Sequence, residues 1–160
     1  MPEQKTNVMR LLDQKKIAYT PHAYPHGDTA IDGVTVAGMI GKAPESVFKT
    51  LVARGTSRTI YVFVIPVCAE LDLKLAARAA GEKAVEMVHV SEINSLTGYV
   101  RGGCSPIGMK KQYKTILDSS SADQKTIVVS AGKIGAQVEL SPEELIRLTR
   151  AATAPVTKEP

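Results

Sequence analysis

The stretch that decides the fold is VFKTLVARGTSRTIYVFVIPV, residues 47–67. It contains two runs rich in β-branched and aromatic residues, 47–54 and 59–67, separated by a polar segment. Such residues favour strands. The run IYVFVIPV (60–67) is apolar throughout, which suits a buried strand and falls well short of the roughly 20 residues that cross a membrane. We therefore predict two strands here, the second of them buried.

Helix caps and turn residues place the other elements around these strands. A capping side chain before a helical apolar pattern begins a helix, and a glycine after it ends one. Helices are predicted from Thr6 to about Lys16, over 36–40, between Asp72 and Gly81, after a cap at Ser91, and from Ser141 to about Ala151. Further strands are predicted over 17–20, 84–90, 115–118, 126–130 and 136–140. A glycine-flanked turn, 131–135, joins the last two.

The order of these elements predicts an α+β fold. Strands outnumber helices, and there is no steady β-α-β alternation of the kind that builds a parallel sheet. We expect a mixed, barrel-like sheet flanked by helices. A chain of 160 residues fits one domain. We place that domain at residues 1–152 and expect 153–160 to be a flexible tail.

Composition and charge exclude several classes of protein. With 44% hydrophobic and 22% charged residues, the chain is globular. Its first ten residues contain no apolar signal core, so we expect a cytoplasmic protein. Cys68 and Cys104 match no zinc or CxxC spacing and are expected to be thiols. The net charge of +4 permits a phosphate-bearing partner, whereas 4% aromatic residues and no tryptophan do not suit a platform that stacks several bases.

The loop RGGCSPIGMKK, residues 101–111, combines glycines, a cysteine and basic side chains. The spacing of Gly103 and Gly108 matches part of a P-loop, but Met109 stands where that motif requires lysine, and no hydroxyl follows. Cys104 is either a nucleophile or a small residue that fits a tight loop. The glycines either let backbone N–H groups hold an anion or a carbonyl oxygen, or only form a surface turn.

Lys49 is the charged residue that the strand pattern singles out. Alternation places it on one face with Val47, Leu51 and Ala53. An ammonium group among apolar side chains is costly unless it meets water or an anion. Lys49 is therefore either part of an anion-binding site or a charge on an edge strand that discourages aggregation.

Histidines and carboxylates show no metal-binding pattern. His22 and His26 lie among turn residues, without an acidic or cysteine partner at ligand spacing. The carboxylates with clear positions are interpreted as helix caps: Glu70, Asp72, Glu143 and Glu144. We expect neither a metal nor another cofactor.

Five sequence blocks carry a family resemblance: VFKTLV (47–52), YVFVIPV (61–67), LDLKLAARAAGEKAVEM (71–87), TGYVRGGCSPIG (97–108) and VSAGKIGAQVELSPEEL (129–145). Over roughly residues 5–150 the chain resembles the YbaK/EbsC family, single-domain relatives of the editing domain in bacterial prolyl-tRNA synthetases. The best-known members are Cys-tRNA(Pro) deacylases, which hydrolyse the ester between a wrong amino acid and its tRNA. The resemblance implies an α+β fold around a barrel-like sheet and a trans-editing deacylase that acts on tRNA(Pro) mischarged with cysteine.

The resemblance also implies the residues of the site. The family's lysine corresponds to Lys49, which would have the catalytic role. Its glycine-rich loop corresponds to Gly102, Gly103, Cys104, Ser105 and Pro106, and its other substrate-binding positions to Tyr24, Ser130 and Gln137. Lys110, Lys111 and Lys114 would meet phosphates of the acceptor stem. The family further implies that the thiol of the substrate attacks its own ester, and it suggests a transient complex with prolyl-tRNA synthetase.

The chain departs from the family pattern at a few positions. Ile31 or Asp32 stands where some members have an aromatic residue, Ile134 interrupts the usual K-R-G of the hairpin, and Gln137 replaces an acid of the pocket. Because small side chains differ by only about 1–3 kcal/mol in a pocket, Ala- or Ser-tRNA is an alternative substrate. A non-catalytic module that binds RNA ends or nucleotides is the alternative from another class, supported by the mild positive charge.

Overall fold

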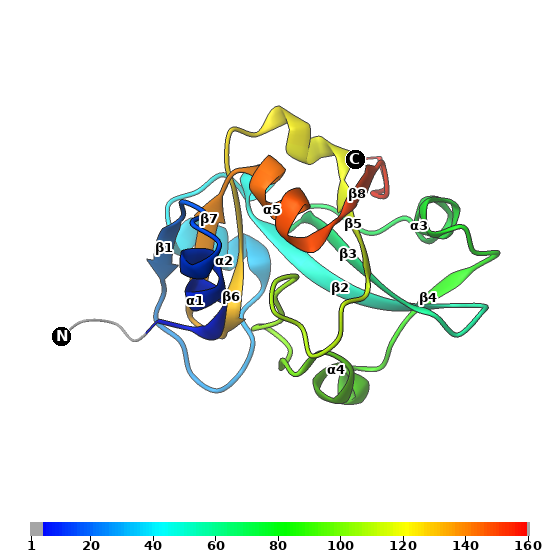
Figure 1. Cartoon of the computed structure of the whole chain (residues 1–160), viewed down its shortest axis with the longest axis horizontal. Coiled ribbons are helices and arrows are strands. Elements are labelled where there is room, and N and C mark those ends of the chain that lie inside the picture. Colours follow the sequence, from blue (N-terminus) through cyan, green and yellow to red (C-terminus); the bar gives the residue numbers. More distant parts are fainter. Residues whose placement is uncertain (1–4, 160) are drawn as a thin grey trace.

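The computed structural model describes residues 5–159, which form two β-sheets (Figure 1). One sheet has the strand order β1 (Thr20–Ala23), β7 (Ala136–Leu140), β6 (Ile127–Lys133). The other has the order β4 (Val85–Met87), β2 (Phe48–Gly55), β3 (Ile60–Pro66), β5 (Lys114–Asp118), β8 (Ala152–Ala154). The second sheet is mixed, because β5 runs parallel to both β3 and β8. The prediction of an α+β fold is confirmed.

Short helices surround the sheets. They are α1 (Asn7–Gln14), α2 (Gly33–Met39), α3 (Leu73–Ala80), α4 (Val90–Thr97) and α5 (Pro142–Thr149). The predicted caps Thr6, Asp72 and Ser141 each accept a hydrogen bond from a backbone N–H of the helix that follows. Each helix has seven or eight residues, so none within residues 5–159 is long enough to cross a membrane.

β2 and β3, the two strands predicted from the opening stretch, form an antiparallel hairpin. The register pairs Phe48 with Pro66. Residues 61–66 are all buried because β3 lies between β2 and β5 and has a hydrophobic core on each face. Val64 belongs to one core and Ile65 to the other. The unbroken apolar run therefore reflects a strand covered on both sides.

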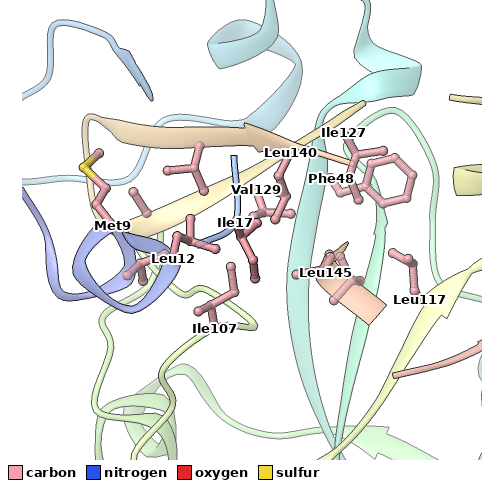
Figure 2. Packing of buried hydrophobic residues seen from close by; sticks show 14 of the residues in the cluster. Met9, Leu12, Ile17, Phe48, Ile107, Leu117, Ile127, Val129, Leu140 and Leu145 are labelled. Carbon is pink, nitrogen blue, oxygen red and sulfur yellow. The ribbon is translucent and has the colours of Figure 1, made fainter. Parts of the chain in front are cut away.

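The larger core fills the space between the two sheets (Figure 2). Both sheets, α1 and α5 contribute to it, and the labelled side chains include Leu12, Phe48, Ile127, Leu140 and Leu145. Burial of such a side chain contributes about 1.5–3 kcal/mol. Side chains from β2, β3 and β5 pack with α3 on the other face of the second sheet. A parallel bridge between Val47 and Val128 joins the sheets where they meet.

Three predicted elements are placed differently in the structure. The strand predicted over 17–20 instead occupies 20–23 and passes through Pro21, which an edge strand tolerates because the missing N–H weakens no central ladder. The helix expected after Ser91 begins at Val90, with His89 in the cap position. The Glu92 carboxylate accepts the N–H of His89, so the preceding strand stops earlier than its β-rich sequence predicts.

The prediction of a flexible tail over 153–160 is wrong for the residues that the structure describes. β8 extends the second sheet beside β5, and Val156 is fully buried. The Val156 N–H donates to the Asp118 carboxylate, and its carbonyl accepts the N–H of Asp72. These partners lie far away in the sequence, which explains why the local pattern gave no sign of them. Residue 160 lies outside the described residues.

Candidate active site

A cavity of about 120 Å³ opens between α2, the start of β2, the loop after α4 and the sheet that contains β6 and β7. It is the place where segments distant in the sequence meet. Six of the predicted site residues line it: Tyr24, Lys49, Gly102, Cys104, Ser130 and Gln137. The lining residues that the structure describes include no carboxylate and no imidazole. The cavity therefore offers one ammonium group, neutral polar groups and apolar walls.

Lys49 enters the cavity wall from the beginning of β2. It pairs with Ile65 across the hairpin and lies on the face whose later residues, Leu51 and Ala53, pack in the α3 core. Its side chain is half-buried and makes no salt bridge within residues 5–159. A partly desolvated cation with no protein anion beside it is suited to a ligand that brings negative charge.

Two buried polar atoms in the cavity wall have no hydrogen-bond partner. They are Thr50 Oγ1 and Gln137 Oε1, and between residues 5 and 159 no other buried side-chain oxygen or nitrogen is left in this state. An unsatisfied buried polar group costs about 1–3 kcal/mol. Their occurrence together in one cavity indicates that the wall is built to face a polar ligand.

The glycine-rich loop meets the cavity at Gly102 and Cys104. Gly102 has φ +87°, and a Cβ there would lie 2.7 Å from the Cβ of Ala30. A Cβ on Gly103 would lie 3.0 Å from backbone atoms of Lys133 and Ile134. The two glycines therefore allow the glycine-rich loop to approach two other segments closely, the chain around Ala30 and the hairpin turn at Lys133 and Ile134.

Three of the predicted loop residues do not line the cavity. The N–H of Gly103 donates to the carbonyl of Val100 and is not free for a ligand. Ser105 is fully buried, and its hydroxyl accepts the N–H of Ile107. Pro106 is also buried. These residues stabilise the conformation of the loop. The family resemblance predicted that they contact the substrate, because it does not distinguish residues that shape the loop from residues that line the cavity.

Cys104 has the properties of a neutral thiol. Burial raises its pKa to about 11, and a hydrogen bond with Thr97 offsets only part of this effect. Burial, and secondarily the neighbouring Cys104, raises the pKa of Tyr99 to about 12, so this hydroxyl is no base for the thiol at neutral pH. Since the thiolate is the nucleophilic form, Cys104 fits the interpretation of a small residue in a tight loop.

The three lysines predicted to contact tRNA are all exposed, but they do not form one group. Lys110 and Lys111 follow the glycine-rich loop directly. Lys114 pairs with Tyr61 at the start of β3 and lies with its Nζ 5.9 Å from the centroid of that ring. The cavity is at the opposite end of β3, about 20 Å away at 3.3 Å per residue. Along the chain, Lys110 and Lys111 follow Cys104 in the cavity wall more closely than Lys114 does.

Sequence reasoning missed most of the apolar wall and one polar group. The missed residues are Gly33, Val36, Val47, Phe48, Thr50 and Val67. A Cβ on Gly33 would lie 2.3 Å from the Val67 side chain, so this glycine lets α2 pack closely against the turn that follows β3. The apolar residues look like ordinary core in the sequence. Only Thr50 could have been recognised from the sequence, because it is a polar residue next to Lys49 in a strand that is otherwise mostly apolar.

A larger cavity of about 730 Å³ lies elsewhere, beside the exposed Cys68. Its walls carry several carboxylates, including Glu45, Asp118 and Asp123. Asp118 is buried, but its oxygens accept hydrogen bonds from Ser120 and Val156, which gives it a structural role. An acidic surface of this kind repels a polyanion, so the smaller cavity is the better candidate.

Comparison with known proteins agrees with the geometry. A model of the aminoacyl-tRNA editing domain matches residues 25–148. A protein of Enterococcus faecalis, provisionally named Cys-tRNA(Pro)/Cys-tRNA(Cys) deacylase EbsC, is 44% identical over 155 residues, which cover 97% of this chain and 94% of the relative.

Solved structures share the fold. One, described provisionally as a trans-editing enzyme for prolyl tRNA synthetase, has a TM-score of 0.82 at 23% identity and covers 98% of this chain and 100% of its own. A hypothetical protein has a TM-score of 0.84 at 24% identity, with coverages of 94% and 99%. The family model spans more than half of the chain, and the EbsC relative matches nearly all of it. The chain therefore belongs to the aminoacyl-tRNA editing domain family and is an aminoacyl-tRNA deacylase.

Proposed function

We propose that this deacylase acts in trans on Cys-tRNA(Pro). The observation that carries the proposal is the small cavity in which Lys49 lacks an anionic partner and two buried polar atoms lack hydrogen bonds. About 120 Å³ is well below the roughly 300–1,000 Å³ of pockets that enclose drug-sized ligands. Such a cavity suits a small aminoacyl group, with the nucleotides of the tRNA outside it.

The unsatisfied polar atoms favour a polar side chain over a methyl group. The side chain of cysteine or serine offers one donor, which either Thr50 Oγ1 or Gln137 Oε1 can accept. The alanine side chain lacks this donor and leaves one more of these atoms unsatisfied, at a cost of about 1–3 kcal/mol. This argument ranks Cys- and Ser-tRNA above Ala-tRNA, and it supports the choice of cysteine together with the name of the EbsC relative.

Lys49 is assigned the central electrostatic role. Its ammonium group pairs with a phosphate of the terminal nucleotide as a mobile point charge. Pairing at this point fixes the acylated end of the tRNA while Tyr24, Gly102 and Ser130 bound the aminoacyl group. Orientation of two reacting groups in this manner supplies several kcal/mol of catalysis.

The absence of a general base from the described cavity wall favours a nucleophile supplied by the substrate. The cysteinyl sulfur attacks its own carbonyl carbon, a sulfur–carbon bond forms, and the ester carbon–oxygen bond breaks. The thiol proton passes to the ribose oxygen that leaves with the tRNA. The resulting cyclic thioester then reacts with water to give free cysteine. No acyl-enzyme forms in this scheme.

A direct consequence concerns the two cysteines of the protein. Cys104→Ser and Cys68→Ser are each expected to keep activity within about threefold of the wild type, because the reacting sulfur belongs to the substrate and the Cys104 thiol, with its pKa raised to about 11 by burial, is protonated at neutral pH. Single-turnover rates on Cys-tRNA(Pro) measure this. An acyl group trapped on Cys104, with activity lost in the serine variant, would contradict the scheme.

Binding of the tRNA body is assigned to Lys110 and Lys111, with Lys114 farther along the same surface segment. A transient complex with prolyl-tRNA synthetase would deliver the mischarged tRNA before its release. The test is a deacylation panel of Cys-, Ala-, Ser- and Pro-tRNA(Pro), each with and without the synthetase. We expect Cys-tRNA(Pro) to be the fastest substrate. Faster hydrolysis of Ala-tRNA(Pro) would overturn the choice of cysteine, and equal hydrolysis of all four would overturn editing.

A further inference from the structure

Gln137 is a buried polar residue of the cavity wall that no contact within the fold accounts for. Its side chain lies in a residue that is 7% exposed, and its Oε1 atom has no hydrogen-bond partner in the described part of the chain. His22 and Ser130 stand opposite Gln137 on the two adjacent strands. The His22 ring bonds Glu139 instead, and the Ser130 hydroxyl accepts a backbone N–H. Gln137 Oε1 is therefore free to accept a donor from a ligand.

The aminoacyl group of the substrate brings two groups that can donate a hydrogen bond inside the cavity. One is the side chain of cysteine or serine, and the other is the α-amino group. Thr50 Oγ1, the second unsatisfied atom, belongs to a hydroxyl, which can accept from that side chain or donate to it. Gln137 Oε1 can only accept. The α-amino group, with several N–H bonds, is therefore the better partner for Gln137.

Gln137 also lies on the wall away from Lys49. It belongs to β7 of the three-stranded sheet, whereas Lys49 belongs to β2 of the other sheet, and β6 lies between the two strands. An amino group at Gln137 is thus kept apart from the ammonium group of Lys49, which repels a second positive charge.

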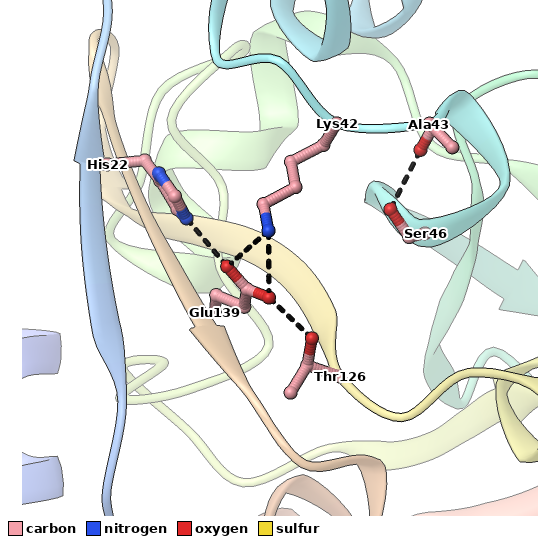
Figure 3. A network of polar contacts seen from close by, with 6 residues as sticks. All are labelled: His22, Lys42, Ala43, Ser46, Thr126 and Glu139. Carbon is pink, nitrogen blue, oxygen red and sulfur yellow. Dashed lines mark hydrogen bonds and ion pairs between the residues drawn. The ribbon is translucent and has the colours of Figure 1, made fainter.

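The carboxylate nearest to Gln137 along the chain is already paired. Glu139 belongs to a cluster behind the cavity (Figure 3), with its Oε1 atom 2.8 Å from His22 Nε2 and 3.0 Å from Lys42 Nζ. Burial would raise the pKa of Glu139, but hydrogen bonds from Thr126 and from these two residues outweigh this effect and lower the pKa to about 2. Glu139 is therefore charged at neutral pH, and Lys42 compensates that charge.

The other charges around the cavity favour an uncharged amine. The described wall contains Lys49 but no carboxylate, and the Cys104 thiol, whose pKa burial raises to about 11, stays protonated. Asp32, at the start of α2, accepts two hydrogen bonds from Thr35. Burial of a charge without a partner is costly. The remaining titratable residues on the surrounding loops are exposed to solvent: His26, Asp28, Arg101 and Lys133.

We propose that Gln137 Oε1 accepts a hydrogen bond from the α-amino group of the aminoacyl ester, and that the cavity takes up this group as the neutral amine. The inference rests on the proposed function and deepens it, because it assigns a part of the substrate that the thiol-assisted scheme does not use. Gln137 is thus a specificity-determining residue that selects acyl groups with an α-amino group.

The test uses two forms of tRNA(Pro) that bind without reacting, because a 3′-amino group on the terminal adenosine holds the acyl group as an amide. One form carries a seryl group, whose hydroxyl does not titrate near neutral pH. The other carries a 3-hydroxypropionyl group, in which hydrogen replaces the α-amino group. At pH 8.5 the wild type should bind the seryl form about tenfold more tightly, the effect of one hydrogen bond to a buried acceptor.

This preference should fall about fivefold between pH 8.5 and pH 7.0, because an α-amino group has a pKa of about 7.7–8.0 and is mostly charged at the lower pH. The 3-hydroxypropionyl form reports every other effect of pH, including titration of His22 and His26. The ratio of the two dissociation constants therefore isolates the amine.

Gln137→Met removes the acceptor at nearly constant side-chain length and should abolish the preference for the seryl form at pH 8.5. It should not lower the unfolding temperature, because the amide that it removes is buried without a partner. Gln124→Met is the matched control. Gln124 is half-buried beside the larger cavity, and its replacement should leave both the preference and its pH dependence unchanged.

Equal dissociation constants for the two forms on the wild type would overturn the inference, and so would a preference that Gln137→Met retains. A preference that stays constant or grows from pH 8.5 to pH 7.0 would show that the charged amine is bound, which also contradicts it. Hydrolysis of Cys-tRNA(Pro) by the wild type is measured separately. Its failure would overturn the proposed function, whereas the two unreactive probes would still decide on Gln137.

Discussion

Lys49→Ala is expected to abolish deacylation of Cys-tRNA(Pro), with a loss of at least about 10²–10³-fold, the usual effect of removing one electrostatic group from an active site. The protein should stay folded, with an unfolding temperature equal to or above that of the wild type. The reason is that Lys49 is half-buried and forms no salt bridge within the described part of the chain, so it contributes little to stability.

The matched control for this variant is Lys74→Ala. Lys74 is an exposed lysine on α3, away from the cavity, and its removal changes the net charge by the same amount. Activity and thermal unfolding should be measured on both variants. A Lys49→Ala protein that keeps most of the wild-type rate would show that the catalytic site lies elsewhere.

Ser-tRNA(Pro) should bind about as well as Cys-tRNA(Pro) but react about two orders of magnitude more slowly. A hydroxyl needs a general base, whose contribution is typically 10²–10⁴-fold, and the described walls offer no carboxylate or imidazole. A thiol has a pKa near 8.5 and is intrinsically nucleophilic. The rate on Cys-tRNA(Pro) should therefore rise with pH toward about 8.5 and then level off, as the thiolate fraction does. Equal rates for the two substrates would refute thiol assistance and require an activated water.

Gly102→Ala extends this comparison to the cavity wall. The residue has φ +87°, and the added Cβ would press on Ala30 and Ile134, so the loop has to shift away from its neighbours. We expect a lower rate on both substrates with their ratio preserved, because geometry changes and chemistry does not. A variant that loses the preference for cysteine but keeps its rate on serine would contradict this account.

Much of the fold can be predicted from local patterns. The apolar run after residue 59 predicts a buried strand, and the caps Thr6, Asp72 and Ser141 predict three helices. All of these are confirmed. Strand alternation also singles out Lys49, because a charge in a β-rich run is conspicuous in any sequence. Such features depend on neighbours within a few residues, which is the range over which sequence patterns carry information.

The remaining features depend on contacts between distant segments. The pairing of β8 with β5 and the burial of Val156 arise where residues near 155 meet residues near 118. His22 and Glu139 are 117 residues apart, so the cluster behind the cavity leaves no local trace. The resemblance placed Ser105 at the site, but its burial and its hydrogen bond to Ile107 give it a structural role. The positions of Thr50 and Gln137 as unsatisfied groups emerge only when the cavity closes around them.

The most direct test of the central claim is the decay of the ester bond in Cys-tRNA(Pro) and in Pro-tRNA(Pro), measured side by side with the purified protein and without the synthetase. The account predicts that the protein accelerates release of cysteine at least about a hundredfold over the spontaneous rate, in keeping with a site that acts by orientation, and leaves Pro-tRNA(Pro) at its spontaneous rate. Release of proline as fast as cysteine, or no acceleration of either, would contradict it.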